Sequence, residues 1–151
     1  MDIFRSSSSA ATKRFAEKFA KTATRSRVPR KGALVIALSG ELGSGKTTFA
    51  QGFLRGLGIV KRTTSPTFII FRRYAIRHLQ FAEVYHVDAY RLRSPREILA
   101  LGFQEMLRNP RAIILVEWPE RIRGILPRGI LRIRFSHGRE SRERRILAPV
   151  F

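Results

Sequence analysis

Two continuous apolar runs stand out along the chain, and each predicts a strand that is buried on both faces. The first covers residues 33–38 (ALVIAL) and the second covers residues 112–116 (AIILV). A strand with one solvent face would alternate apolar and polar residues, whereas an unbroken run is typical of a central parallel strand covered by layers on both sides. The pattern therefore predicts an α/β domain.

Shorter patterns predict the elements around these two strands. Ser94, Pro95 and Glu97 form a capped helix start, and Gly102 interrupts that helix. Apolar residues alternate with arginines in 129–136, which predicts one core face and one basic face. The predicted helices cover 10–24, 47–56 and 94–101, and the predicted strands cover 33–38, 68–75, 81–87, 111–117, 129–136 and 144–150. We expect a single domain over 1–151, with 1–9 as a candidate disordered start.

The segment between the first apolar run and the next helix carries a phosphate-binding motif. Residues 40–48 (GELGSGKTT) match the pattern G-x-x-x-x-G-K-[ST] without a mismatch. The glycines let backbone N–H groups point at a phosphate, Lys46 adds a mobile positive charge, and the Thr47 hydroxyl is placed to bind Mg²⁺. The alternative is a glycine-rich turn with a solvated lysine. The predicted nucleotide-binding residues of the loop are Glu41, Leu42, Gly43, Ser44, Gly45, Lys46, Thr47 and Thr48.

Nucleotide chemistry with Mg²⁺ needs further oxygen ligands, and the acids of this chain are few. The sequence has two aspartates, Asp2 and Asp88. Glu117 ends the second apolar strand, where it could hold the metal, and Asp88 follows the 81–87 strand, where it could bind the metal or activate water. Alternatively, Glu117 caps the helix that Pro119 begins, and Asp88 is a turn residue bonded to its own backbone.

Two more positions are candidates for contact with the nucleotide. Trp118 is the one tryptophan of the chain and follows Glu117 directly. It could stack on an adenine or on a partner, or fill a core. Ser65 and Thr67 flank a proline in a loop placed like a GTPase switch, where a hydroxyl can sense the γ-phosphate, or they form an ordinary rigid turn.

The composition is strongly basic, with a formal net charge of +19. The basic residues concentrate at the two ends of the chain, which indicates either an anionic partner such as RNA or an arginine-biased composition on solvated faces. Residues 1–31 resemble a transit peptide, or they contain a first structural helix. The chain has no cysteine and no apolar run of about 20 residues, so we expect a soluble, cytoplasmic protein without a membrane span.

Four segments together resemble the TsaE (YjeE) family of bacterial ATPases. They are 40–49 (GELGSGKTTF), 65–68 (SPTF), 86–92 (HVDAYRL) and 116–119 (VEWP). The resemblance implies a P-loop NTPase-like three-layer α/β domain with a mixed, mainly parallel sheet. It also implies ATP hydrolysis with Mg²⁺, which supports threonylcarbamoyl attachment to adenosine 37 of tRNAs that read codons beginning with A. The TsaB and TsaD proteins are the implied partners.

The resemblance also assigns roles to single residues. Lys46 and Thr47 would bind phosphate and Mg²⁺, with Lys46 contributing to catalysis. Glu117 would be a Mg²⁺ ligand, and Asp88 would help catalysis. Thr12 matches an early threonine that lies near the base of the nucleotide. The chain departs from the family in Glu41, where an Asp is usual, and in its net charge, which leaves room for direct tRNA contact through the basic termini.

Two other classes of protein compete with this interpretation. A small nucleoside or nucleotide kinase would need an acceptor pocket and a lid, for which Arg91, Arg93 and Arg96 could serve. A basic RNA-binding module would use the nucleotide site only as a switch, although no RNA-binding motif is recognisable.

Overall fold

The computed structural model describes residues 1–25, 29–60 and 69–151 of the chain. They form two compact units. Unit 1 comprises Met1–Ser26, Leu38–Thr64 and Arg132–Phe151, and unit 2 comprises Arg27–Ala37 and Ser65–Leu131. Strand β2 (Leu34–Gly40) begins in unit 2 and ends in unit 1. Each unit is described below by itself.

Unit 1 is a sheet covered on one face by two helices. Its elements in chain order are β1 (Asp2–Ser6), α1 (Ser9–Ala23), the end of β2, α2 (Lys46–Gly56), β6 (Leu131–His137) and β7 (Arg144–Ala148). The strands lie in the order β1-β7-β6-β2, and β7 is antiparallel to both β1 and β6. Phe4 stacks on Phe15 at 4.4 Å between ring centroids, and Phe135 meets Phe49 edge-on at 5.5 Å. Aromatic contacts therefore join this sheet to α1 and α2.

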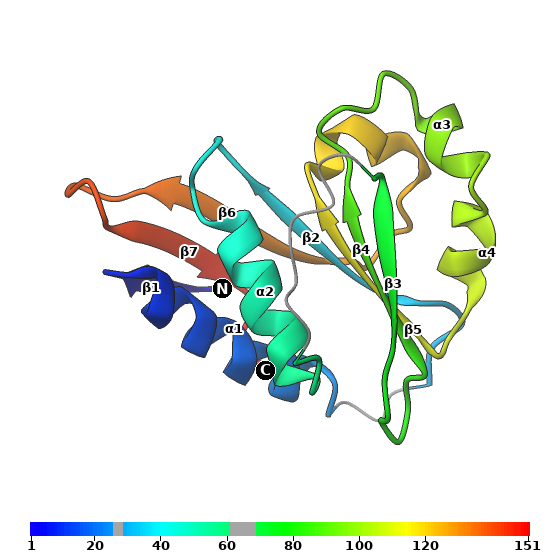
Figure 1. Ribbon diagram of the computed structural model, residues 1–151, viewed down its shortest axis with the longest axis horizontal. Helices are drawn as coiled ribbons and strands as arrows, with labels where there is room; N and C mark the ends of the chain where they lie inside the picture. Colours follow the sequence, from blue (N-terminus) through cyan, green and yellow to red (C-terminus); the bar gives the residue numbers. More distant parts are fainter. Residues whose placement is uncertain (26–28, 61–68) are drawn as a thin grey trace. The chain divides into compact units, whose positions relative to one another are not determined.

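The two helices of unit 1 approach each other closely because small residues line their contact. Figure 1 shows α1 and α2 side by side. A Cβ atom on Gly52 would lie 2.9 Å from the Cβ of Ala16, and one on Gly56 would lie 3.0 Å from the Cβ of Ala20. These distances are too short for a larger residue, so glycine at 52 sets the spacing of the helices.

Unit 2 places two strands with carboxylates at their ends next to each other. Its elements are the start of β2, β3 (Phe71–Ala75), β4 (Glu83–Asp88), α3 (Pro95–Leu99), α4 (Phe103–Arg108), β5 (Ala112–Glu117) and the 3₁₀ helix η1 (Pro119–Ile125). The order is β2-β5-β4-β3, with β4 parallel to β5 and antiparallel to β3. All six residues of β5 are buried, as its unbroken apolar run predicts.

The predicted fold class, an α/β domain with a mixed sheet, is confirmed, and the antiparallel pairings described above lie toward the sheet's edges. The predicted alternation in β6 is also confirmed, because Ile133 and Phe135 are buried while Arg132 and Arg134 are exposed. Strand β3 begins at Phe71, later than the predicted start at 68, which lies outside the described residues.

Four predictions about parts of the chain need correction or stay open. Disorder over 1–9 is wrong, because Asp2–Ser6 pair with β7 along five residues and Ser8 caps α1. The predicted helix over 94–101 ends at Leu99. Gly102, with φ +85°, is the N-cap of α4, a helix that was not predicted from the sequence. Since α1 packs on α2, residues 9–23 form a structural helix, and the transit-peptide interpretation stays a prediction. The single domain stays a prediction.

Candidate nucleotide-binding site

The phosphate loop of unit 1 owes its shape to three glycines with positive φ. These angles are +148° at Gly40, +72° at Gly43 and +104° at Gly45. Residues with a Cβ atom rarely adopt such angles. At Gly40 a Cβ would also overlap the carbonyl oxygen of Phe135. The motif glycines are thus required by the backbone path between β2 and α2.

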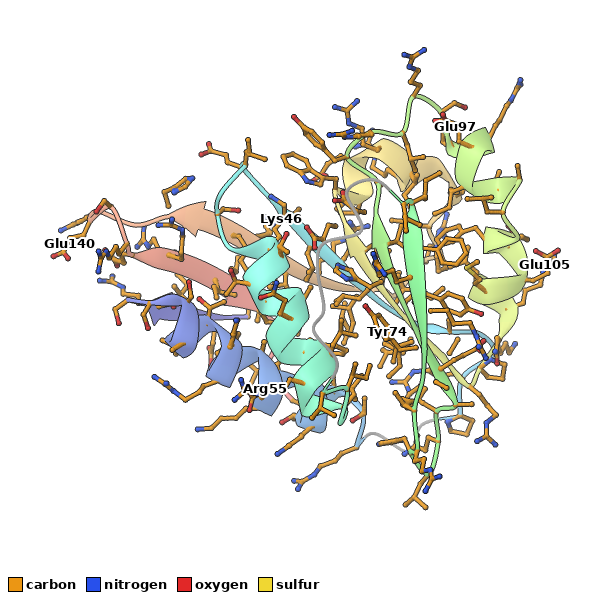
Figure 2. All side chains as sticks on the ribbon, in the orientation of Figure 1. Lys46, Arg55, Tyr74, Glu97, Glu105 and Glu140 are labelled. Carbon is orange, nitrogen blue, oxygen red and sulfur yellow. The ribbon has the colours of Figure 1, made fainter. Side chains whose placement is uncertain are left out.

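Lys46 lies at the start of α2 with its side chain turned back onto the loop (Figure 2). It is 4% exposed, and its Nζ donates to the carbonyl oxygens of Gly40 at 2.6 Å and Glu41 at 2.8 Å. A buried ammonium group is costly unless such dipoles compensate it. The two carbonyls therefore hold the positive charge against the inner side of the loop.

The other predicted loop residues fall into two groups. The side chains of Glu41 and Leu42 are exposed, at 81% and 72%, so their contribution to a phosphate site would come from their backbone. Ser44 is fully buried, and its Oγ has no hydrogen-bond partner among the described residues. An unsatisfied hydroxyl at this depth is unusual and fits a loop built to receive a polar ligand. Thr47 is half-buried in the first turn of α2.

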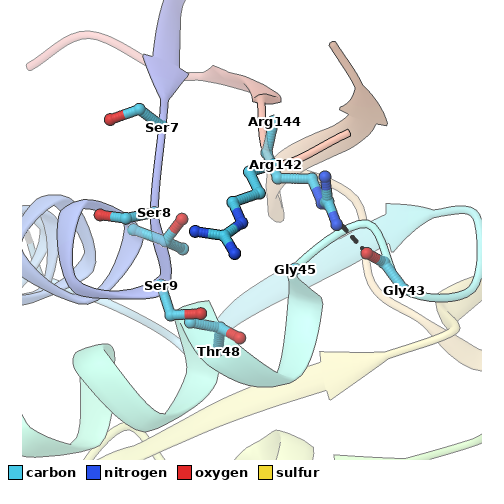
Figure 3. Close-up of a pocket in the computed structure, with 9 residues that line it drawn as sticks. Ser7, Ser8, Ser9, Gly43, Gly45, Thr48, Arg142 and Arg144 are labelled. Atoms are coloured by element: carbon cyan, nitrogen blue, oxygen red, sulfur yellow. Dashed lines mark hydrogen bonds between the residues drawn. The ribbon is translucent and has the colours of Figure 1, made fainter. Parts of the chain in front are cut away.

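A pocket of about 360 Å³ opens beside the loop in unit 1 (Figure 3). Its volume is in the range of ligand sites. It is lined by Ser7, Ser8, Ser9, Thr12, Gly43, Gly45, Thr48, Arg142 and Arg144. The structure thus brings Thr12 and Thr48 together with the loop glycines. Thr12 is buried, and its Oγ1 lies 2.7 Å from the Oγ of Ser6.

Two arginines at this pocket were not among the predicted site residues. Arg144 donates from Nε to the carbonyl oxygen of Gly43 at 3.1 Å, a contact drawn in Figure 3. Its Nη1 donates to the carbonyls of Ser141 and Glu143, which fixes the guanidinium. Arg142 lines the same pocket from the β6–β7 hairpin. Nothing local in the sequence identifies them, because they lie about a hundred residues beyond the loop and only the hairpin returns them to it.

In unit 2 the two candidate carboxylates occupy matching positions on neighbouring strands. Asp88 and Glu117 are register partners at the carboxyl ends of β4 and β5. The Oδ1 of Asp88 accepts from the backbone N–H of Tyr90 at 3.0 Å, which confirms its interpretation as a turn residue. That bond is compatible with a second role, because a carboxylate has several acceptor sites.

Glu117 is 2% exposed and lies against a buried histidine. The distance from its Oε1 to the Nε2 of His86 is 2.8 Å. Because a carboxylate only accepts, the histidine tautomer that fits carries its proton on Nε2. Within the described residues Nδ1 of His86 then lacks a partner. His86 thus orients Glu117, a role that depends on the register of β4 with β5 and was absent from the sequence-based candidates.

Trp118 packs against the core of unit 2. It contacts the buried cluster of that unit, and its ring lies 4.9 Å from that of Tyr90. The core-packing alternative is therefore supported, while contact with an adenine stays a prediction. Trp118 also has φ +59°, a left-handed conformation that costs a side-chain-bearing residue about 1–3 kcal/mol and is common near functional sites.

The described residues include no group of three or more His, Cys, Asp or Glu that could hold a metal ion. Mg²⁺, which typically uses one or two carboxylates together with phosphate oxygens and water, stays a prediction. Thr47 belongs to unit 1 and Glu117 to unit 2, and their sharing of one ion stays a prediction. Ser65 and Thr67 lie outside the described residues. None of the helices in the described ranges is long and apolar enough to cross a membrane.

Known proteins resemble this chain over most of its length. The family model "Threonylcarbamoyl adenosine biosynthesis protein TsaE" matches residues 6–146. The tRNA threonylcarbamoyladenosine biosynthesis protein TsaE of Haemophilus influenzae is 33% identical over 135 residues, covering 89% of this chain and 82% of that protein. The protein of the same name from Rickettsia bellii is 36% identical over 123 residues, covering 81% and 77%. A crystal structure of Bacillus subtilis YdiB superposes with a TM-score of 0.72 and 30% identity, covering 96% and 82%. The chain belongs to the TsaE family of tRNA threonylcarbamoyladenosine biosynthesis proteins.

Proposed function

We propose that this protein hydrolyses ATP in support of threonylcarbamoyladenosine formation on tRNA. The observation that carries the proposal is the phosphate loop, in which three glycines with positive φ precede a buried lysine. That arrangement recognises the phosphates of a nucleotide through backbone N–H groups and one charge. The relatives' printed names supply the pathway.

Lys46 and the loop backbone would bind the phosphates. The Nζ of Lys46 is held by two carbonyls on the inner side of the loop, so the charge is in place before the nucleotide arrives. The N-terminus of α2 adds its dipole to the same anion. Mg²⁺, when bound, would neutralise charge that develops on the phosphates, with Thr47 and Glu117 as its proposed protein ligands.

Asp88 is the group that we propose to orient or deprotonate the attacking water. Its register position beside Glu117 puts the two carboxylates at the same edge of the sheet in unit 2. One or two carboxylates are the usual protein ligands of Mg²⁺ at nucleotide sites. His86 would hold Glu117 in a fixed rotamer, so that the role of Glu117 is to bind while that of Asp88 is to act on water.

The arginines at the pocket fit the same nucleotide. A guanidinium can donate two parallel hydrogen bonds to a phosphate or stack on a base. Arg144 already contacts the loop at Gly43, and Arg142 lines the pocket that Thr12 closes from α1. We propose that both contact bound nucleotide, with Thr12 and Thr48 near its base or ribose.

The partners in this proposal are the TsaB and TsaD proteins, in the cytoplasm. Phosphate release from ATP, measured with Mg²⁺ alone and then with both partners, tests it. We expect slow release by the isolated protein and faster release in the mixture. Negligible release under both conditions, together with phosphate transfer to an added nucleoside, would instead support the kinase alternative, which the comparisons do not favour.

A further inference from the structure

One face of the sheet in unit 1 carries four exposed arginines, Arg5, Arg132, Arg134 and Arg145, which we call the arginine face. Arg5 of β1 lies directly opposite Arg145 of β7, and Arg145 lies opposite Ser136 of β6. Residues opposite each other in an antiparallel pair share a face, and so do alternate residues of one strand. Arg132 and Arg134 therefore lie on the same face as Ser136. All four arginines are exposed.

The strands contribute no acid to this face. Asp2 is the one acidic residue within β1, β6 and β7, and alternation places it on the opposite face with Phe4. That opposite face is the one that packs against α1 and α2, through Phe4 and Phe135. Within unit 1, the arginine face is thus the side of these strands turned away from the two helices.

An exposed strand arginine in unit 2 differs from these four because it has a carboxylate partner. Arg73 of β3 forms an ion pair with Glu83 of β4, with Nη2 and Oε2 2.6 Å apart. In the described part of the chain, no carboxylate pairs with any member of the arginine face. Like charges directly opposite on a sheet are destabilising, so the pair Arg5–Arg145 costs the free protein stability that a bound anion would restore.

We propose that the arginine face binds the phosphate backbone of RNA. Neighbouring positions on such a face are about 5 to 8 Å apart, so it offers a row of charges to a row of phosphates rather than one site to one ion. Guanidinium groups bind phosphates through paired hydrogen bonds. The face holds Ile3 and Leu147 but no aromatic residue, unlike the apolar surface that inserts into a lipid bilayer. The relatives are named for the biosynthesis of a tRNA modification, which makes RNA a natural candidate for this anion.

This inference goes beyond the proposed function, because binding to the arginine face needs no ATP. The test measures the affinity of the full chain for unmodified tRNA, without nucleotide, over a range of salt concentrations. We expect R5Q/R132Q/R134Q/R145Q to bind at least about tenfold more weakly. The slope of log K against log salt should fall by roughly 3, since each lost phosphate contact removes 0.7–0.9.

A matched control is R96Q/R108Q/R123Q/R128Q, which removes the same charge from exposed positions of unit 2. It should stay within about threefold of the native affinity. The double variant R132Q/R134Q should show about half of the fall in slope expected for the first quadruple variant, and it remains informative if that variant misfolds. Equal weakening by both quadruple variants would overturn the proposal. So would binding of phosphatidylserine vesicles or polyglutamate as tightly as tRNA by the native protein.

Discussion

The phosphate loop of unit 1 and the carboxylate pair of unit 2 both follow buried strands, yet they are built from different parts of the chain. The loop is made of consecutive residues, and its exposed side chains at Glu41 and Leu42 contribute little to its shape. The carboxylates are 29 positions apart in sequence and meet only through the register Asp88↔Glu117. The loop is therefore a backbone site, and the carboxylate pair is a side-chain site.

The largest effect on ATP turnover is expected from substitution of Lys46, the side chain that carries the positive charge of the phosphate loop. Lys46→Ala should reduce ATP turnover by about 100-fold or more, because it removes the charge that the loop holds at the phosphates. Lys18→Ala on the exposed surface of α1 is the control and should leave turnover unchanged. Nucleotide titration and phosphate release measure both. Near-native turnover in Lys46→Ala would mean that the loop acts through its backbone alone.

Substitutions of the two carboxylates should have different effects, one on Mg²⁺-dependent nucleotide binding and the other on turnover. Glu117→Gln should abolish the Mg²⁺ dependence of nucleotide binding. Asp88→Asn should keep binding but lower turnover by about 100-fold. Asn can still accept from the N–H of Tyr90, so this variant changes the charge and keeps the turn. Nucleotide affinity with and without Mg²⁺, measured beside turnover, distinguishes them. Identical defects in both variants would contradict the division, and Glu120→Gln, at an exposed position, is the control.

A medium effect, on the free energy of unfolding, is expected at the contact between α1 and α2. Gly52→Ala should lower the free energy of unfolding by about 1–3 kcal/mol, because the added methyl group would lie 2.9 Å from Ala16. Gly124→Ala is the control, since an added Cβ there would meet nothing within 4 Å. Thermal or denaturant unfolding gives both values. Equal stability of the two variants would show that the helices can move apart without cost.

The smallest effect, on the pH dependence of stability, is expected on β4 of unit 2. Burial raises the pKa of Glu83, but hydrogen bonds from Tyr85, Arg73 and Asn109 and the charge of Arg73 outweigh burial and lower the pKa below the ordinary value of a glutamate. A lowered carboxyl pKa stabilises the fold above its unfolded-state value, and that contribution disappears as pH falls through the folded-state value. In Glu83→Gln, the stability should therefore decrease less between neutral and acidic pH than in the native protein. Unfolding midpoints measured from neutral to acidic pH check this, and parallel curves would contradict it.

The difference between the two sites also explains what the sequence could predict. The apolar runs, the motif and the cap at Ser94 are contiguous, so each could be recognised without knowledge of the fold. Pairing of His86 with Glu117 and the return of Arg144 to Gly43 need strand register and hairpin geometry. Strand β1 was missed because five residues with exposed Asp2 and Arg5 show little apolar alternation and become a strand only by pairing with β7.

Trp118 gives this protein an internal optical probe. It is the one tryptophan of the chain, it follows Glu117, and its ring contacts that of Tyr90. Its emission therefore comes from a single place at the carboxylate edge of unit 2. A change in fluorescence on addition of nucleotide would report on that edge, while the phosphate loop in unit 1 contributes no tryptophan signal. Titration of the unlabelled native protein with nucleotide, followed by this emission, therefore tests whether a ligand reaches that edge.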